Sequence, residues 1–139
     1  MEILKIEPTH LTPEIIFSPD ENLFSISGMS APEDVRALYY PVLDWMKKFT
    51  DEVLQGDYLI YDKNIPVLFR IDLGYFNSSS AKFLFDILME LKKLPPEGVP
   101  VLIEWHYDED DTDMKEAGED ISQLLEIKFN YVIKPSRKW

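Results

Sequence analysis

The stretch that decides the fold runs from Pro66 to Leu91 and reads PVLFRIDLGYFNSSSAKFLFDILMEL. Its first part, residues 67–73, is an apolar run that alternates with polar residues through its second half, which is typical of a buried strand. Its last part, residues 82–91, repeats apolar residues every three or four positions and therefore predicts a helix. Between them lies a turn in which Asn77 is followed by three serines, Ser78–Ser80. Such a turn places hydroxyl groups beside the free N–H groups of a helix N-terminus, where a negative group is stabilised.

On either side of this stretch, extended and helical patterns follow one another along the chain. Turn residues at 20–22 precede an alternating segment, which indicates an antiparallel hairpin on the N-terminal side. Strands that alternate with helices favour an α/β layered domain with right-handed crossovers. We therefore expect a mixed β-sheet with parallel central strands, packed by about three helices. The further predicted strands are Ile3–Ile6, Glu14–Phe17, Leu23–Gly28, Val99–Tyr107 and Phe129–Ile133, and the further predicted helices are Pro32–Leu54 and Met114–Leu125.

The helix predicted over Pro32–Leu54 has a start signal and an internal irregularity. Residues 30–33, Ser-Ala-Pro-Glu, have the spacing of a capping box with proline near the first helical position. Pro41 lacks the N–H that would bond to the carbonyl of Ala37, so we expect a kink or a restart there. Apolar residues spaced by threes and fours form the predicted inward face, which consists of Val35, Leu38, Tyr39, Val42, Met46, Phe49 and Val53.

Length and composition limit the classes of protein that this chain can belong to. With 139 residues, 45% of them hydrophobic, we expect one domain over residues 1–139, with a frayed tail at 134–139. Zero cysteines exclude disulfides, thiolate catalysis and Cys-type metal sites. No apolar run is long enough to span a membrane and the start lacks the features of a signal peptide, so we expect a cytoplasmic protein. The net charge of −12 argues against nucleic-acid binding, which needs clustered Lys and Arg.

The three serines do not carry the signals of a nucleophilic enzyme. An activated serine needs a base within reach, commonly a histidine that is oriented by a carboxylate. The chain has two histidines, His10 in a proline-rich segment and His106 in a different predicted strand, and no glycines flank the serines in the GxSxG manner. Helix capping, for which Asn and Ser are preferred, needs one such residue and does not account for three hydroxyl groups. We therefore expect no catalytic residue here.

The acidic run Asp108–Asp113 raises an alternative function, a site for a hard cation such as magnesium or calcium. Residues 108–113 could then serve a metal-dependent enzyme that acts on phosphate esters. The run lacks the ligand spacing and the glycine of an EF-hand loop. Acidic residues are also preferred in the first turn of a helix. We favour a solvated capping loop, and we expect neither a bound metal nor a cofactor.

The helix that follows the serines presents two different faces. At about 100° per residue, Phe83 and the apolar residues at 84, 87, 88 and 91 share one arc, which is the predicted core face. Phe85 and Met89 fall on the opposite side, in line with Lys82 and Ser78. We call Lys82, Phe85 and Met89 the docking stripe, because apolar residues exposed beside a helix-start hydroxyl are typical of a protein-binding surface. The sequence equally allows another element to cover Phe85 and Met89.

The turn itself, Tyr75-Phe76-Asn77-Ser78-Ser79-Ser80-Ala81-Lys82, resembles the signature turn of the SiaC-type bacterial regulatory phosphoproteins. These proteins are distant structural relatives of STAS-domain anti-sigma-factor antagonists, so the resemblance implies a STAS-like fold. It extends in the same order over nearly the whole chain. The supporting segments are Pro13–Phe17, Gly28–Glu33, Tyr40–Trp45, Glu104–Tyr107 and Asp110–Met114.

The resemblance implies a partner-switching role without catalytic activity. Members of the family are phosphorylated on a Thr or Ser of this turn by a protein Ser/Thr kinase and dephosphorylated by a metal-dependent phosphatase. In the best-understood system of the family the unphosphorylated form binds and activates a diguanylate cyclase, which implies a link to c-di-GMP signalling. By position the acceptor is Ser78, where the family more often has Thr, with Ser79 as the second choice. The residues expected to bind partners are Asn77, Ser79, Ser80, Lys82, Phe85 and Met89.

Overall fold

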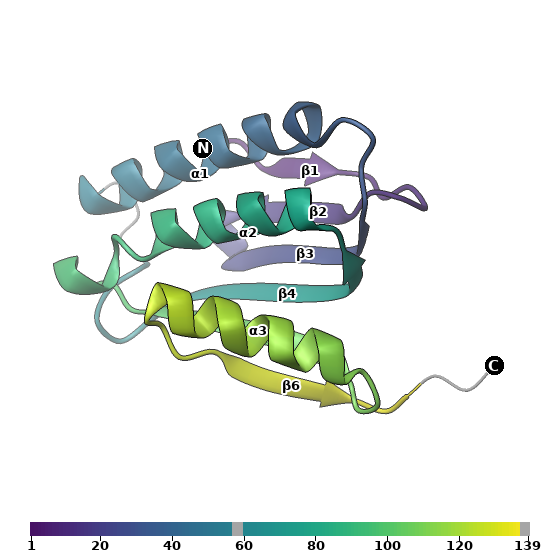
Figure 1. The fold of residues 1–139 in the computed structure, drawn as a ribbon. Coiled ribbons are helices and arrows are strands. Elements are labelled where there is room, and N and C mark those ends of the chain that lie inside the picture. The colour runs from purple at the N-terminus through teal and green to yellow at the C-terminus, as the bar shows by residue number, and fades with distance from the viewer. Residues whose placement is uncertain (57–59, 137–139) are drawn as a thin grey trace.

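The computed structural model describes residues 1–56 and 60–136, which form one six-stranded sheet and three α-helices in the described ranges (Figure 1). This is the mixed α/β architecture that the alternation of patterns predicts. The strands, which also follow this order across the sheet, are β1 (Leu4–Ile6), β2 (Glu14–Ser18), β3 (Leu23–Ser30), β4 (Val67–Phe76), β5 (Val101–Asp108) and β6 (Asn130–Lys134). The helices are α1 (Val35–Leu54), α2 (Ser78–Leu91) and α3 (Thr112–Leu125).

The sheet has an antiparallel part and a parallel part. β1, β2 and β3 are antiparallel neighbours, and a 3-10 turn at Pro19–Glu21 connects β2 with β3. β3, β4, β5 and β6 are parallel neighbours, and each pair is connected through one of the helices α1, α2 and α3. The predicted N-terminal hairpin and the predicted parallel centre of the sheet are therefore both confirmed.

All three helices lie on the same face of the sheet, in front of the strands as seen in Figure 1. The alternation in β4 agrees with this arrangement, because Val67, Phe69 and Ile71 are buried under the helices while Leu68 and Arg70 are exposed. Towards its end β4 runs three residues beyond the predicted stretch 67–73, because its parallel partner β3 also continues, and Ser30 lies opposite Phe76.

The core between sheet and helices is rich in aromatic side chains. Phe24 of β3 lies 5.0 Å from Phe49 of α1 and 6.4 Å from Phe69 of β4, measured between ring centroids. Trp105 of β5 is completely buried under α3 and donates a hydrogen bond of 2.9 Å to the carbonyl of Met114. The predicted inward face of α1 is confirmed: Tyr39, Val42, Met46, Phe49 and Val53 are buried, and Val35 and Leu38 pack against the core.

The predicted start of α1 is wrong, because the capping box at 30–33 does not form. Ser30 is the last residue of β3 and is buried, so its hydroxyl is not available to cap a helix. Asp34 caps α1 instead, and its Oδ1 accepts a hydrogen bond of 3.1 Å from the N–H of Ala37. The helix continues through Pro41 without the restart that we allowed for.

The expectation of a frayed tail at 134–139 is wrong for its first residues. Lys134 belongs to β6 and forms ion pairs with Asp72 of β4 and Asp108 of β5. The hydroxyl of Ser136 donates a hydrogen bond of 3.1 Å to Glu109. The rest of the predicted tail, residues 137–139, lies outside the described residues.

Candidate functional site

The turn between β4 and α2 is held by Asn77, which is the N-cap of the helix. Its backbone is extended (φ −86°, ψ 173°), and its Oδ1 accepts a hydrogen bond of 2.9 Å from the N–H of Ser80. Its carbonyl accepts from the N–H of Ala81 at 3.0 Å, and its own N–H donates to the carbonyl of Ser30 at 3.0 Å. The turn is therefore tied both to the first turn of α2 and to the end of β3.

Ser80 lies inside the protein, in a buried cluster of three hydroxyl groups. Its side chain is 0% exposed, and its Oγ donates to the carbonyl of Ser30 at 3.1 Å. The Oγ of Ser30 donates to the Oγ of Ser80 at 2.8 Å and lies 2.6 Å from the hydroxyl of Tyr39. Burial raises the pKa of Tyr39, while the hydrogen bonds of Ser30 and Ser80 act in the opposite direction. The inclusion of Ser80 among the partner-binding residues is therefore wrong, since its hydroxyl is enclosed by α1 and β3.

Ser79 and Ser78 both lie at the surface, but their hydroxyl groups differ in their contacts. The hydroxyl of Ser79 donates a hydrogen bond of 3.0 Å to the Oδ1 of Asn77. The hydroxyl of Ser78 makes no hydrogen bond to any residue that the structure describes. Ser78 is also the first residue of α2, where the backbone N–H groups of a helix have no partner within the helix. An anionic group on Ser78 would thus be placed where the helix dipole favours it.

The docking stripe is only partly exposed. Lys82 lies at the surface, pairs with Asp86 at 3.1 Å and places its ammonium group 5.2 Å from the ring centre of Phe83. Met89 is 42% exposed, but Phe85 is half-buried and packs against the core. Within the stripe, Lys82 and Met89 are therefore the side chains most available to a partner.

Three exposed side chains near the turn are not among the predicted partner-binding residues. Met29 and Tyr75 are register partners at the ends of β3 and β4, and they are 40% and 50% exposed. Tyr40 of α1 is also exposed and meets the ring of Phe83 edge-on at 5.6 Å between ring centres. We use the name turn surface for the four exposed residues Ser78, Met29, Tyr40 and Tyr75. Strand alternation carried past Gly74 would have placed Tyr75 on the buried face with Leu73. The register between β3 and β4 shifts at this point, and Tyr75 is exposed.

The acidic run behaves as a capping loop. The side chain of Asp111 caps α3 and accepts a hydrogen bond of 3.0 Å from the N–H of Met114. Asp108 lies 3.8 Å from the ammonium group of Lys134, so its charge is partly neutralised. Within residues 1–56 and 60–136, no group of three or more His, Cys, Asp or Glu is arranged to hold a metal ion. The geometry gives no support to the metal-dependent enzyme that we considered as an alternative.

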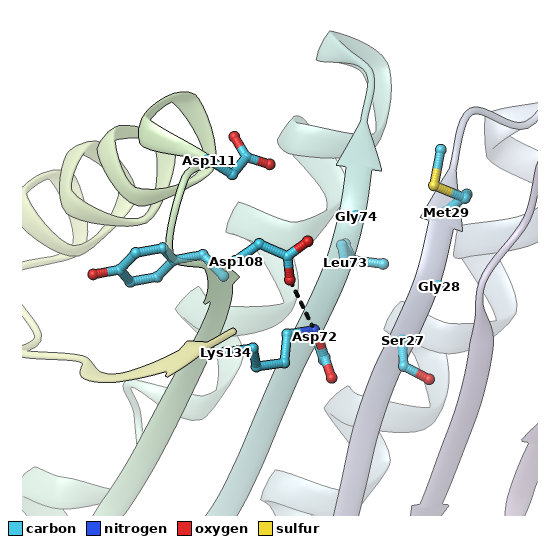
Figure 2. A pocket seen from close by; sticks show the side chains of 10 residues that line it. Ser27, Gly28, Met29, Asp72, Leu73, Gly74, Asp108, Asp111 and Lys134 are labelled. Carbon is cyan, nitrogen blue, oxygen red and sulfur yellow. Dashed lines mark hydrogen bonds and ion pairs between the residues drawn. The ribbon is translucent and has the colours of Figure 1, made fainter. Parts of the chain in front are cut away.

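A pocket of about 470 Å³ lies beside this loop, at the carboxyl ends of the parallel strands (Figure 2). Asp72, Asp108 and Lys134 project into it from β4, β5 and β6, with the ammonium group close to both carboxylates. His106, the histidine in β5, is nearly buried and lies 3.2 Å from Glu104, away from the three serines. The pocket therefore holds one ammonium group among the three carboxylates of Asp72, Asp108 and Asp111, and none of the residues that line it is a histidine.

Across the part of the chain that the structure describes, no helix combines the length and the apolar character needed to traverse a membrane.

Comparisons with known proteins agree on one family. A sequence model described as "SiaC family regulatory phosphoprotein" matches residues 6–134. An uncharacterised protein of Pseudomonas aeruginosa strain UCBPP-PA14 is 31% identical over 129 residues, which cover 93% of this chain and 94% of that protein. The crystal structure of apo-SiaC from P. aeruginosa is 29% identical, with a TM-score of 0.76 over 96% of this chain and 99% of that one. A third match is a chain in the crystal structure of the diguanylate cyclase SiaD in complex with its activator SiaC, also from P. aeruginosa. That chain is 28% identical, with a TM-score of 0.78 over 96% of this chain and 99% of that one.

Proposed function

Since the chain belongs to the SiaC family of regulatory phosphoproteins, we propose that it is a binding protein whose affinity for its target is set by phosphorylation of Ser78. Family membership makes the chain a regulator and not an enzyme. The proposal adds which residue is modified, what the modification does to the surface, and which class of protein responds to it.

We choose Ser78 as the acceptor because the three serine hydroxyl groups differ in their exposure and in their hydrogen bonds. Ser80 is buried and donates to Ser30, and Ser79 donates to Asn77. Ser78 is exposed, and its hydroxyl is not engaged by any described residue. A kinase that approaches the turn therefore meets one free hydroxyl group. Ser79 remains the second choice, since one hydrogen bond has to break before it can react.

A phosphate on Ser78 changes the surface and leaves the fold in place. The group adds a charge of roughly −1.5 to −2 and three acceptor oxygens. At the first position of α2 the unpaired N–H groups and the helix dipole accept this charge. A partner that covers the turn surface would have to remove water from the phosphate, which is costly for an unpaired charge. Phosphorylation should therefore release a partner that binds the unmodified form.

For the target we propose a diguanylate cyclase, because SiaD, a diguanylate cyclase, crystallises with SiaC as its activator. The unphosphorylated chain would bind the cyclase through the turn surface together with Asn77, Ser79, Lys82, Phe85 and Met89, and would act in c-di-GMP signalling in the cytoplasm. A protein Ser/Thr kinase and a metal-dependent phosphatase would set the phosphorylation state. Residues 1–139 would act as one domain, whose described parts share one sheet and one core.

Mass spectrometry of the chain purified from its native cells tests the modification directly. We expect phosphate on Ser78, its complete loss in Ser78→Ala, and its retention in the matched variant Ser79→Ala. Stoichiometric phosphorylation of Ser78→Ala would show that the assignment of the acceptor is wrong.

The second half of the proposal is tested by the rate of c-di-GMP synthesis. A diguanylate cyclase from the same organism is assayed with and without the added chain. We expect Ser78→Ala to activate it as the unmodified chain does. Ser78→Asp should need about tenfold more protein, the equivalent of about 1.4 kcal/mol for a poorly compensated charge at the interface. Equal activation by both variants would contradict a charge-based switch.

A further inference from the structure

We propose that Ser30 and Tyr39 determine which serine is phosphorylated, through the buried hydroxyl cluster that they form with Ser80. This inference rests on the proposed function and extends it to residues outside the turn. Neither residue is exposed: Ser30 and Tyr39 are each 0% accessible, so they act on the turn from beneath it. They are positioning residues, which set the geometry of the acceptor without touching the kinase.

The cluster has one consistent arrangement of protons. The Oγ of Ser80 donates to the carbonyl of Ser30, so the Oγ of Ser30 has to supply the proton between the two side chains. The hydroxyl of Tyr39 then donates to the Oγ of Ser30, at 2.6 Å. Every hydroxyl proton in the cluster is therefore committed, and across the described residues no buried side-chain N or O atom is left without a partner.

The cluster joins three elements at the point where the acceptor turn begins. Tyr39 comes from α1, Ser30 from the end of β3, and Ser80 from the first turn of α2. The carbonyl of Ser30 also accepts the N–H of Asn77, which in turn holds the hydroxyl of Ser79. The buried cluster thus fixes Ser80 directly and Ser79 through Asn77, and Ser78 alone stays unconstrained.

Tyr39→Phe isolates the role of the hydroxyl group. The ring of Tyr39 stacks on Phe83 at 5.5 Å with an interplanar angle of 9°, and a phenylalanine keeps this contact. Tyr39 is the donor at the end of the chain of hydrogen bonds, so its loss leaves no buried donor without an acceptor. The matched control is Tyr61→Phe, because Tyr61 is also buried and donates its hydroxyl to the carbonyl of Pro19, away from the turn.

The rate of backbone hydrogen exchange measures how firmly the turn is held, and the measurement needs no kinase. We expect the N–H groups of Ser80 and Ala81, both bonded to Asn77, to exchange about fivefold faster in Tyr39→Phe, the effect of losing roughly one net hydrogen bond. In Tyr61→Phe their exchange should stay as in the wild type. Unchanged exchange in Tyr39→Phe would overturn the inference.

Mapping of the phosphorylated residues in protein from the native cells then shows which serine the kinase modifies. In the wild-type chain and in Tyr61→Phe we expect phosphate on Ser78 alone, and in Tyr39→Phe we expect part of it on Ser79 or Ser80. A purely structural role would change the amount of folded protein and not this distribution. Faster exchange with phosphate still confined to Ser78 would overturn the specificity role, whereas a wild-type chain without phosphate would contradict the proposed function itself.

Discussion

Gly118 of α3 shows how closely single residues are fitted in this protein. A Cβ atom at this position would lie 2.5 Å from the Nε1 of Trp105, whose indole is fully buried and bonded to Met114. The ring cannot move without breaking that hydrogen bond, and the contact is far shorter than packed atoms allow. α3 can therefore lie this close to β5 only with glycine here.

We predict that Gly118→Ala lowers the free energy of unfolding by about 1–3 kcal/mol, the usual effect of overpacking a core. The effect runs against helix propensity, by which alanine is the better helix former. Glu116→Ala, an exposed change in the same helix, serves as the control and should stay within about 0.5 kcal/mol of the wild type. Denaturant titrations of both variants measure the difference, and equal midpoints would contradict the close packing of α3 on Trp105.

Asn77 both caps α2 and holds the hydroxyl of Ser79. A comparison with Asp111, which only caps α3, separates the two roles. Asn77→Ala and Asp111→Ala each remove a side chain that caps a helix, so each should cost about 1 kcal/mol of stability. Only Asn77→Ala also frees the hydroxyl of Ser79. We predict that phosphate appears on Ser79 in Asn77→Ala and not in Asp111→Ala, as measured by mass spectrometry. The same distribution in both variants would leave Asn77 with a structural role only.

For single residues, the sequence predicted a helix cap at this turn. It did not predict which serine hydroxyl is buried, which is hydrogen-bonded and which is free. Asn and Ser at the start of a helical pattern indicate capping, and Asn77 does cap α2. Which serine is buried depends on Ser30, fifty positions earlier in the chain, and no local pattern contains that contact. The same distant contact explains why the predicted capping box fails, because it keeps Ser30 at the end of β3.

At the scale of elements, the two apolar residues of the docking stripe should respond differently to truncation. Met89 is 42% exposed, so Met89→Ala should change stability by less than about 0.5 kcal/mol and weaken the activation of the cyclase. Phe85 packs against the core, so Phe85→Ala should lower stability by about 1–3 kcal/mol, less than for a fully buried ring. Thermal unfolding and the cyclase assay, run on both variants, test this. A large loss of stability in Met89→Ala would place that side chain in the core.

The spacing of apolar residues predicted most helices and strands correctly, because each of these elements buries one of its faces in the core. In α2 the predicted core residues Phe83, Leu84, Ile87, Leu88 and Leu91 are all buried. The alternation in β4 was lost at Gly74, which looks like the end of a strand in one sequence. In the folded chain β4 continues because β3 runs beside it to Ser30. The register shifts between Gly28 and Met29, which breaks the alternation and leaves Tyr75 at the surface.

At the scale of the whole molecule, the order of the strands explains why the three α-helices of the described residues all cover the same face of the sheet. Parallel neighbours β3, β4, β5 and β6 follow one another in the sheet as they do in the chain. Right-handed crossovers that always move in the same direction place every connecting helix on the same face. The sequence predicted parallel strands and crossovers, but strand order depends on contacts between distant segments. The relationship to STAS domains stays a prediction.

The opposite face of the sheet carries ion pairs that connect neighbouring strands. Arg70 of β4 lies 3.6 Å from Glu104 of β5, and Lys134 of β6 reaches Asp72 and Asp108 on the other two strands. Lys134 is thus the cation that joins the edge strand to the centre of the sheet. Its partners matter because the chain as a whole carries a net charge of −12. Without this cation, neighbouring carboxylates on β4 and β5 would repel each other.

We therefore predict that Lys134→Ala lowers the free energy of unfolding by about 1 kcal/mol at low salt, the upper end for a partly exposed ion pair. The loss should shrink as salt screens the exposed carboxylates. Lys128→Ala is the matched control: Lys128 is exposed, and each substitution takes the net charge from −12 to −13. Denaturant titrations at low and high salt measure both variants. Equal losses would mean that overall charge, and not the contact of Lys134 with Asp72 and Asp108, stabilises the edge of the sheet.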